Sequence, residues 1–483
     1  MAAATVIAAL PVVTVMVLRL AAPSRPPPLF LAQKYRQHAA WTVLFAACLC
    51  SDATYSGHTF GWSFLLRGVQ SELELTTTHL SLLWASGILT TAPLLLLVGQ
   101  MIECFGQLRV ASIVSPLWVL VVGLASHASD PLQLGLAIFA MRLLGPGVLC
   151  MCAQACIGHW FDARRGLASV IFTCANWLMI MVQPLVARLV EAIGWRHALR
   201  TLSLVYAGML LPAMAFLRDQ PESYGLAPDG GLRTSRRTRA GHAELTAEDV
   251  TQHADLAAPE EVDAMADAMS MRDSAGAASA AATVGLSRGQ AVRTRAFWAV
   301  VLCHASIEFL WCGSQLFLVE LLGARGLAPT QVGTAQVVGS AAAVVATVSA
   351  GLCVDRIERP HDKRLVLVGA TALGAAAALA LISCNSLTVA CMATGLLGTM
   401  MGPLDVLFAS LYASLFGRAH LGSILGLVQG LTYVAIGSSP VVFGAARDRL
   451  GSFTPVLAPL VVWMPIVALA LAAAPPVLVP PKS

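Results

Sequence analysis

The chain has 483 residues, of which 57% are hydrophobic and 12% charged, and its formal net charge is +4. Soluble globular proteins carry about a quarter of their residues as charged side chains, so this composition excludes an ordinary water-facing surface and favours a protein that crosses a bilayer many times. The small charge excess lies in short loops between apolar runs, which argues against a nucleic-acid partner.

The first predicted region, residues 1–40, precedes the main series of apolar runs. Residues 1–21 are apolar, and a Pro-rich stretch follows from Pro23 to Pro28. No positively charged region precedes the apolar run, which weakens the interpretation as a signal peptide. An extra anchor, a targeting segment and a simple N-terminal extension therefore all stay open.

Twelve long apolar runs predict twelve membrane-spanning helices, because lipid offers backbone groups no hydrogen-bond partner. The first six fill residues 41–217, at 41–65, 79–99, 108–126, 131–157, 166–190 and 199–217. The second six fill residues 296–476, at 297–321, 329–353, 364–384, 386–415, 421–445 and 453–475. Residues 218–295 between them are polar and rich in Ala, Ser and Gly, which predicts a disordered linker. A tail, 477–483, ends the chain.

Orientation follows from the Lys and Arg residues of the short loops. The loops on the linker's side, which include Arg109, Arg164 and Lys363, carry a modest excess over the opposite loops. The positive-inside rule then predicts that both termini and the linker are cytoplasmic, provided that residues 1–21 do not span. The plasma membrane is the default location, and an organelle membrane is the alternative.

The two groups of six spans repeat each other at an offset of about 255 residues. Trp41 corresponds to Trp298, Gly147 to Gly402, Phe161 to Phe416 and Gly194 to Gly451, while Asp52 and Gly57 correspond in spacing to Glu308 and Gly313. A consistent offset over the whole length predicts two pseudo-symmetric halves. Parallel repeats of this kind place a solute site near the midplane, between the halves. One half then rocks against the other and opens the site to each side of the membrane in turn.

Several motifs make the chain similar to the major facilitator superfamily. They include Gly351-Leu-Cys-Val-Asp355-Arg356-Ile-Glu-Arg359, the fourth-span segment Arg142-Leu-Leu-Gly145-Pro-Gly147, and His159-Trp-Phe161-Asp-Ala-Arg164-Arg165-Gly166. Gly194-Trp-Arg196 and Pro221-Glu-Ser-Tyr-Gly225 further resemble the oxalate/formate antiporter and monocarboxylate transporter-like branch. The resemblance covers residues 40–475 apart from the linker. It implies the all-α major facilitator fold with twelve transmembrane helices.

The resemblance also implies loops that control gating. Glu103 and Arg109 follow the second span, and Asp355, Arg356 and Arg359 follow the eighth. Charge pairs among such residues would bridge helix ends and bias one conformation against the other. The alternative is that these charges only set the topology. The first copy departs from the motif, because Glu103 replaces the usual Asp and Cys104 the usual Arg.

Ionisable side chains inside the spans are the candidates for substrate or proton handling, because each costs roughly 2.5–3.5 kcal/mol to insert. Asp52 and Glu308 occupy equivalent positions of the first and seventh spans. Arg142, in the fourth span, keeps its charge and suits a carboxylate, either of a substrate or of Asp52. Structural pairing is the competing interpretation for all three.

Five further side chains complete the predicted site. Asp405 lies in the tenth span, where it would face a cation or Arg142, and His58 and His304 lie one or two turns from the carboxylates. Tyr55 and Gln315 are neutral candidates for the cavity lining. A lone His on an apolar face more often packs than functions, so packing is weighed against proton transfer for both histidines.

The sequence therefore predicts a secondary transporter that moves a small organic solute, in the first instance a monocarboxylate with a proton. A neutral amino-acid facilitator is the alternative within this class, and a non-transporting receptor or scaffold is the alternative outside it. The sequence carries no phosphate-binding loop, nucleophile elbow or zinc-ligand spacing, so neither an enzyme nor a cofactor or metal is predicted.

Overall fold

The computed structural model describes residues 38–161, 164–224, 226, 286–354, 360–416 and 421–475. All regular elements within these ranges are helices. The predicted N-terminal region up to residue 37, most of the predicted linker and the C-terminal tail lie outside the described residues. The predictions made for them, including the disorder of the linker, stay predictions.

The first half contains η1 to η4 and the helices α4 to α11. In chain order these are α4 (Ala39–Asp52), η1 (Tyr55–Gly57), η2 (Thr59–Trp62), α5 (Leu66–Leu73), α6 (Thr77–Phe105), α7 (Gln107–Ala125), α8 (Pro131–Arg142), η3 (Leu143–Leu149), α9 (Cys150–Trp160), α10 (Arg165–Ile180), α11 (Gln183–Phe216) and η4 (Pro221–Tyr224). Here α4, η1 and η2 form the first span, α8 to α9 the fourth, and α10 with the start of α11 the fifth.

The second half contains the helices α14 to α21. They are α14 (Arg288–Val292), α15 (Arg295–Leu316), α16 (Leu318–Gly323), α17 (Pro329–Val354), α18 (Pro360–Ile382), α19 (Leu387–Phe416), α20 (Leu421–Leu450) and α21 (Thr454–Ala472). The spans from the seventh to the twelfth are therefore α15, α17, α18, α19, α20 and α21.

Twelve spans result from the described helices. Nine helices among the described residues are long and apolar enough to cross a membrane, and one of them, Gly166–Phe216, makes two passes because Gly194 interrupts it at φ 75°. The interrupted first span and α6 complete the set. The sequence-based prediction of an all-α, multi-pass membrane protein is confirmed.

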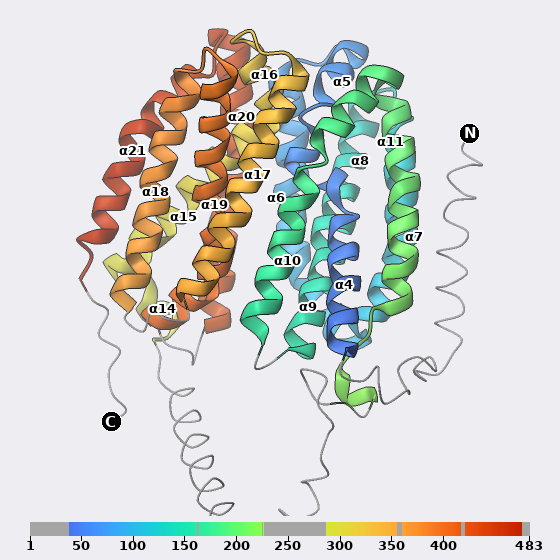
Figure 1. The fold of residues 1–483 in the computed structure, drawn as a ribbon, viewed down its shortest axis with the longest axis vertical. Coiled ribbons are helices and arrows are strands. Elements are labelled where there is room, and N and C mark those ends of the chain that lie inside the picture. Colours follow the sequence, from blue (N-terminus) through green and yellow to red (C-terminus); the bar gives the residue numbers. More distant parts are fainter. Residues whose placement is uncertain are drawn as a thin grey trace, which may run out of the picture.

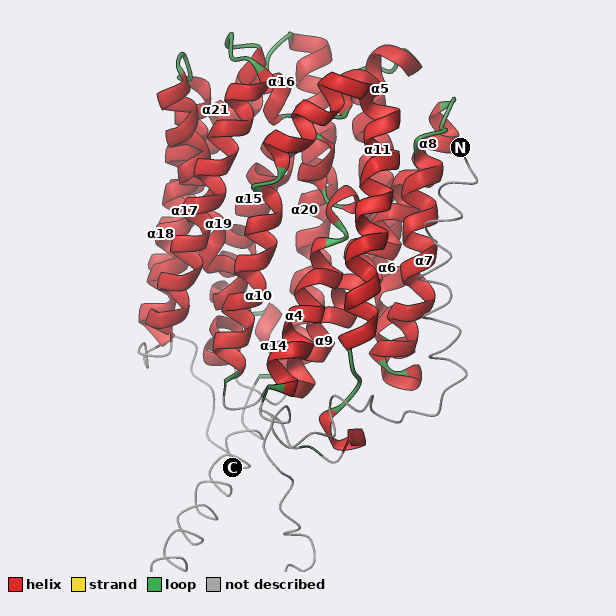
Figure 2. Cartoon of the chain, turned by 45° about the vertical axis from the view of Figure 1, so that its right-hand side comes forward, coloured by secondary structure: helices red, strands yellow, loops and turns green. Residues whose placement is uncertain are grey.

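The two halves lie side by side, with the blue-to-green half and the yellow-to-red half each forming its own bundle (Figure 1). They meet mainly where α6 packs on α20 and α10 on α17, and where η2 touches α15. We call the end of the bundle that carries α5 and α16 the α5/α16 end; it is opposite α9 and α14 in both views (Figures 1 and 2).

Similar contacts recur in the two halves, as the repeat predicts. Phe161 packs edge-on against Trp41 with ring centroids 5.3 Å apart, and Phe416 packs edge-on against Phe297, the residue before Trp298, at 5.9 Å. Gly451 corresponds to Gly194 and also has a positive φ, 69°. In both halves this left-handed glycine lets the chain turn sharply between the last two spans.

Paired charges stabilise the ends of the first and seventh spans. Arg196 Nε donates to Glu72 Oε1 at 2.7 Å, and Arg447 Nε donates to Glu320 Oε1 at the same distance. The hydrogen bond from Arg196 lowers the pKa of the Glu72 carboxyl. Both pairs lie at the α5/α16 end. In each half, an arginine of a long helix thus forms an ion pair with a glutamate of the short helix, α5 or α16.

The first span is not the continuous helix that the sequence predicts. Regular α-helix ends at Asp52, and two short 3₁₀ turns follow. Local polar groups compete with the helical ladder here, since Thr54 Oγ1 donates to Ser51 O at 2.6 Å. The interruption also brings Gly57 against Pro146 of η3, a π-helical turn of the fourth span.

A methyl group at Gly57 would therefore disturb this contact. An added Cβ would meet Pro146 Cδ and would lie 2.8 Å from Met141 O. We expect Gly57→Ala to lower the free energy of unfolding by about 1–3 kcal/mol through overpacking. Gly208→Ala is the control, because nothing lies within 4 Å of a Cβ there. Thermal unfolding of both variants in detergent would show the difference, and equal melting temperatures would contradict it.

Candidate functional site

The interrupted first span leaves carbonyl oxygens that side chains of other spans satisfy. Trp118 Nε1 donates to Ala53 O at 2.8 Å, Arg142 Nη1 to Gly57 O at 3.1 Å and Gln183 Nε2 to Phe60 O at 3.0 Å. Non-helical backbone at membrane depth persists only where protein or a polar cavity surrounds it. Broken helices of this kind are where transporters place their binding sites.

Arg142 is the cation of this region. It ends α8, immediately before the π-helical turn η3, and its guanidinium lies 5.9 Å from the centre of the Trp84 ring. The bond to Gly57 O uses one nitrogen, while Nε is buried and has no partner among the described residues. The ion pair with Asp52, which was one of the sequence-based hypotheses, is not formed. The guanidinium thus retains donors for a further acceptor.

Arg142 faces the second half of the protein. Tyr433 of α20 and Cys312 of α15 lie within electrostatic range of its guanidinium. Both residues are also within electrostatic range of Glu308. The cation of the first half and the carboxyl of the second therefore share neighbours at the interface, and the role of both as a site stays a prediction.

A compact polar cluster lies beside Arg142. Thr54 Oγ1 is 3.2 Å from His58 Nε2 and 3.4 Å from Cys150 Sγ. Ser51 Oγ donates to Asn176 Oδ1 at 2.9 Å. The His58 ring also stacks on Phe60, with centroids 5.0 Å apart. His58 is therefore held by Thr54 and by Phe60 next to the first-span interruption, and it is one of the predicted residues that the structure brings into the site.

Three other predicted side chains of this region, those of Asp52, Tyr55 and Gln315, each have a buried polar atom without a hydrogen-bond partner among the described residues. Asp52 is the last residue of α4, and its Oδ1 is buried without a hydrogen-bond partner among the described residues. The same holds for Tyr55 OH and for Gln315 Oε1 of α15. Buried polar groups are normally paired, so these three atoms are candidates for contact with a solute, water or proton.

The second half contributes a His–Glu pair on α15. His304 Nε2 lies 3.8 Å from Glu308 Oε1, one helical turn away, with side chains 7% and 16% exposed. Close by, Trp177 of α10 packs edge-on against Trp311 of α15 with centroids 5.3 Å apart. Both titratable groups of α15 thus lie on the helix that meets the first half.

The remaining candidates are only partly described. Asp405 lies in α19 and Glu103 in α6, but their side chains are outside the described residues, as are Asp355, Arg356 and Arg359 altogether. Arg109, near the start of α7, is exposed and forms no ion pair with another described residue. The gating role of these loops therefore stays a prediction.

Asp219 is a residue that the sequence did not single out. Its Oδ1 accepts a hydrogen bond of 2.9 Å from Leu108 N, at the first turn of α7, beside Gly106 with φ 83°. The neighbouring Asp219 O accepts from Trp160 Nε1. Hydrogen bonds thereby connect the end of the sixth span to the start of the third span and to the end of the fourth span. No local signal could reveal this cap, because cap and helix are 111 residues apart.

Removing this cap should cost stability. We expect Asp219→Ala to lower the free energy of unfolding by about 0.5–2 kcal/mol, the usual value of a side-chain N-cap. Asp219→Asn keeps an oxygen acceptor and should retain most of it. Thermal unfolding in detergent would test both, and an equal loss in the two variants would show that charge rather than capping matters.

These features define a polytopic membrane protein whose two helical halves enclose a polar site at their interface, as in carriers of small solutes. Residues 44–440 match the family model of the Major Facilitator Superfamily, and the chain belongs to this superfamily.

A more limited similarity concerns a bacterial transporter. Over 158 residues, the chain is 28% identical to the "Probable sulfoacetate transporter SauU" of Cupriavidus necator. The match covers 32% of this chain and 36% of that protein, so it spans just over a third of the relative's length.

Proposed function

We propose that this transporter moves a small organic monoanion, in the first instance a monocarboxylate, together with a proton. The observation that carries the proposal is Arg142. It is a half-buried guanidinium beside an interrupted helix, with one bond to Gly57 O and with Nε unpartnered. A guanidinium fork matches a carboxylate in shape and charge. The carboxylate of a solute is the missing partner that this geometry favours.

The number of cations favours a single negative charge on the solute. The eighth span, 329–353, and the eleventh, 421–445, contain no charged residue at all. Arg142 therefore faces the interface without a second guanidinium or ammonium group from those spans. Tyr433 and Cys312 are uncharged donors beside it. One cation balances one carboxylate, whereas a dianion would leave a net charge buried in a site of low dielectric.

A sulfonated carboxylate, a dianion whose second charge a co-transported proton would have to offset, is the second candidate solute. The relative's printed name assigns sulfoacetate, a small organic oxyanion, to a protein that shares part of this sequence. A sulfonate is also an oxygen acceptor that a guanidinium recognises. The same uptake assay separates this candidate, a monocarboxylate and a neutral amino acid.

The proton in this proposal is carried by the carboxyls of the first and seventh spans. Asp52 has an unpartnered Oδ1, and Glu308 lies 3.8 Å from the His304 ring. A carboxyl takes up and releases a proton, so a proton that enters with the anion makes the transported pair electrically neutral. A pH gradient, rather than the membrane potential, would then drive uptake.

Alternating access requires that contacts between the halves break. At the α5/α16 end, Arg67 Nη2 donates to Val319 O at 3.3 Å and Thr78 N donates to Asp448 Oδ2 at 2.6 Å. Both bonds join the first half to the second. Because an aspartate at a helix N-terminus is favourable, the Asp448 contact with the start of α6 stabilises closure of this end.

The role of Arg142 can be tested by uptake. We expect Arg142→Gln to lower uptake of a radiolabelled monocarboxylate into proteoliposomes at least a hundredfold, because the neutral amide removes the positive charge that binds the carboxylate in this proposal. Arg188→Gln is the control, since Arg188 of α11 is exposed. Lactate, pyruvate, formate, sulfoacetate and a neutral amino acid should be compared. Unchanged uptake in Arg142→Gln would refute the proposal.

The proton role can be tested separately. Wild-type uptake should rise at least tenfold when the outside is made acidic, and should not respond to a potassium diffusion potential. Asp52→Asn and Glu308→Gln cannot take up the proton, so we expect the response to acid to be lost in at least one of them while substrate exchange persists. If both variants keep the full response to pH, the carboxyls do not carry the proton.

A further inference from the structure

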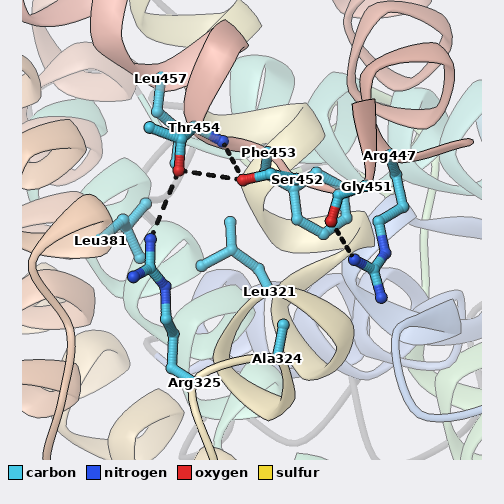
Figure 3. Close-up of a pocket in the computed structure, with 10 residues that line it drawn as sticks. All are labelled: Leu321, Ala324, Arg325, Leu381, Arg447, Gly451, Ser452, Phe453, Thr454 and Leu457. Carbon is cyan, nitrogen blue, oxygen red and sulfur yellow. Dashed lines mark hydrogen bonds between the residues drawn. The ribbon is translucent and has the colours of Figure 1, made fainter. Parts of the chain in front are cut away.

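A separate cavity lies within the second half, at the α5/α16 end. It has a volume of 460 Å³ and is lined by residues of α16, of the loop after it, of the ends of α18 and α20, and of the start of α21 (Figure 3). A cavity of this size suits a small organic ligand. None of the predicted transport residues lines it.

Two guanidinium groups stand on either side of this cavity. Arg325 and Arg447 both belong to the lining and flank Leu321 in the close-up view (Figure 3). Arg447 uses Nε for Glu320 Oε1 and Nη1 for Gly451 O. Glu320 offsets one of the two charges, so one positive charge remains uncompensated. A cavity whose lining carries an excess positive charge is a place for an anion.

Both arginines keep donors that no described residue uses. Arg325 makes a single long bond, from Nη2 to Thr454 Oγ1 at 3.4 Å, which leaves its Nε and Nη1 available. Arg447 keeps its Nη2. The Ser452 hydroxyl donates to Thr454 Oγ1 at 3.1 Å, so the Thr454 hydroxyl, which lies beside Arg325, is the further donor. These groups would hydrogen-bond the oxygens of a carboxylate, phosphate or sulfonate.

The rest of the lining is apolar. Leu321, Leu381, Phe453 and Leu457 face the same cavity. These four side chains are almost fully buried in the helix packing, so they close the cavity and offer a ligand little apolar surface. The polar groups of the lining therefore decide what binds, and they fit an oxyanion.

We propose that this cavity is a second binding site, for an organic oxyanion, held by Arg325 and Arg447. The ligand is a soluble organic anion or the headgroup of an anionic lipid, since both present the same oxygens next to apolar groups. The site is distinct from the transport site around Arg142.

The position of the cavity links it to closure of the protein. Arg447 precedes Asp448, which bonds to Thr78 of the first half. Glu320, the partner of Arg447, follows Val319, whose carbonyl accepts from Arg67. The ends of α16 and α20 thus line the ligand cavity and also form the hydrogen bonds to the first half. A bound anion braces both ends and favours the closed arrangement of this face.

Binding is tested on the full chain in nanodiscs made only of phosphatidylcholine. Hexanoate is titrated against an equal concentration of chloride, and the melting temperature is recorded. We expect a saturable rise in the wild type and at least a tenfold weaker apparent affinity in Arg325→Gln. Arg449→Gln is the matched control, because Arg449 is exposed in the last turn of α20 and does not line the cavity.

Two further arms separate the alternatives. Arg142→Gln should keep the rise, because hexanoate at the transport site would be lost in that variant. To probe for a lipid headgroup, nanodiscs that contain phosphatidylglycerol are used in place of hexanoate. If the melting temperature rises in these nanodiscs in a way that depends on Arg325, and does not respond to hexanoate, the cavity is a lipid site. Absence of any rise with either probe, or an equal loss in Arg325→Gln and Arg449→Gln, overturns the proposal.

The link to closure has its own readout. Hexanoate on the α5/α16 face should lower the initial uptake rate at least twofold in the wild type but not in Arg325→Gln. This measurement rests on the proposed function, whereas the melting temperature does not, so failure of the one is distinguishable from failure of the other. Inhibition that persists in Arg325→Gln would show competition at the transport site and contradict the link.

Discussion

The structure depends on one constraint, which is that backbone carbonyls freed inside a membrane must find donors within the protein. The first span loses its helical ladder after Asp52, and donors from the third, fourth and fifth spans replace it. Trp118, Arg142 and Gln183 are fixed in orientation by this requirement. The guanidinium that we assign to the solute is therefore positioned by a structural bond to Gly57 O, and its remaining donors are directed by the same contact.

Much of the architecture could be predicted from the sequence, because it follows from patterns that repeat. Apolar runs of about 20 residues located the spans, and the offset between Phe161 and Phe416 or between Gly194 and Gly451 identified the halves, whose similar contacts the structure shows. Rare charges inside apolar runs likewise singled out Arg142 and Glu308, whose roles stay predictions. The prediction of the spans succeeded because the cost of charge and of unpaired backbone in lipid acts locally on each span.

What the sequence did not reveal depends on contacts between distant segments. The repeat predicted that the first and seventh spans would be alike, yet α15 continues through Gly313 whereas the first span leaves the α-helix after Asp52. Besides the local bond from Thr54 to Ser51 O, the two spans differ in their surroundings, since Gly57 lies against Pro146 of a π-helical turn and Gly313 against Phe443 of α20. The cap by Asp219 and the absence of an Arg142–Asp52 ion pair are long-range facts of the same kind.

The broken first span also has a consequence for how the two halves can diverge. Its exposed carbonyls bind side chains from three other spans, so a substitution in any one of these spans needs a compatible donor at the same place. In α15 the helical hydrogen bonds are intact, and the bond from Ser439 of α20 to Phe309 O is an addition to them, so its neighbours meet fewer such requirements. After a duplication, the first half would accumulate changes slowly and in concert, whereas the second half would be freer to drift. Differences in solute preference among related carriers should then arise more readily from residues of the second half.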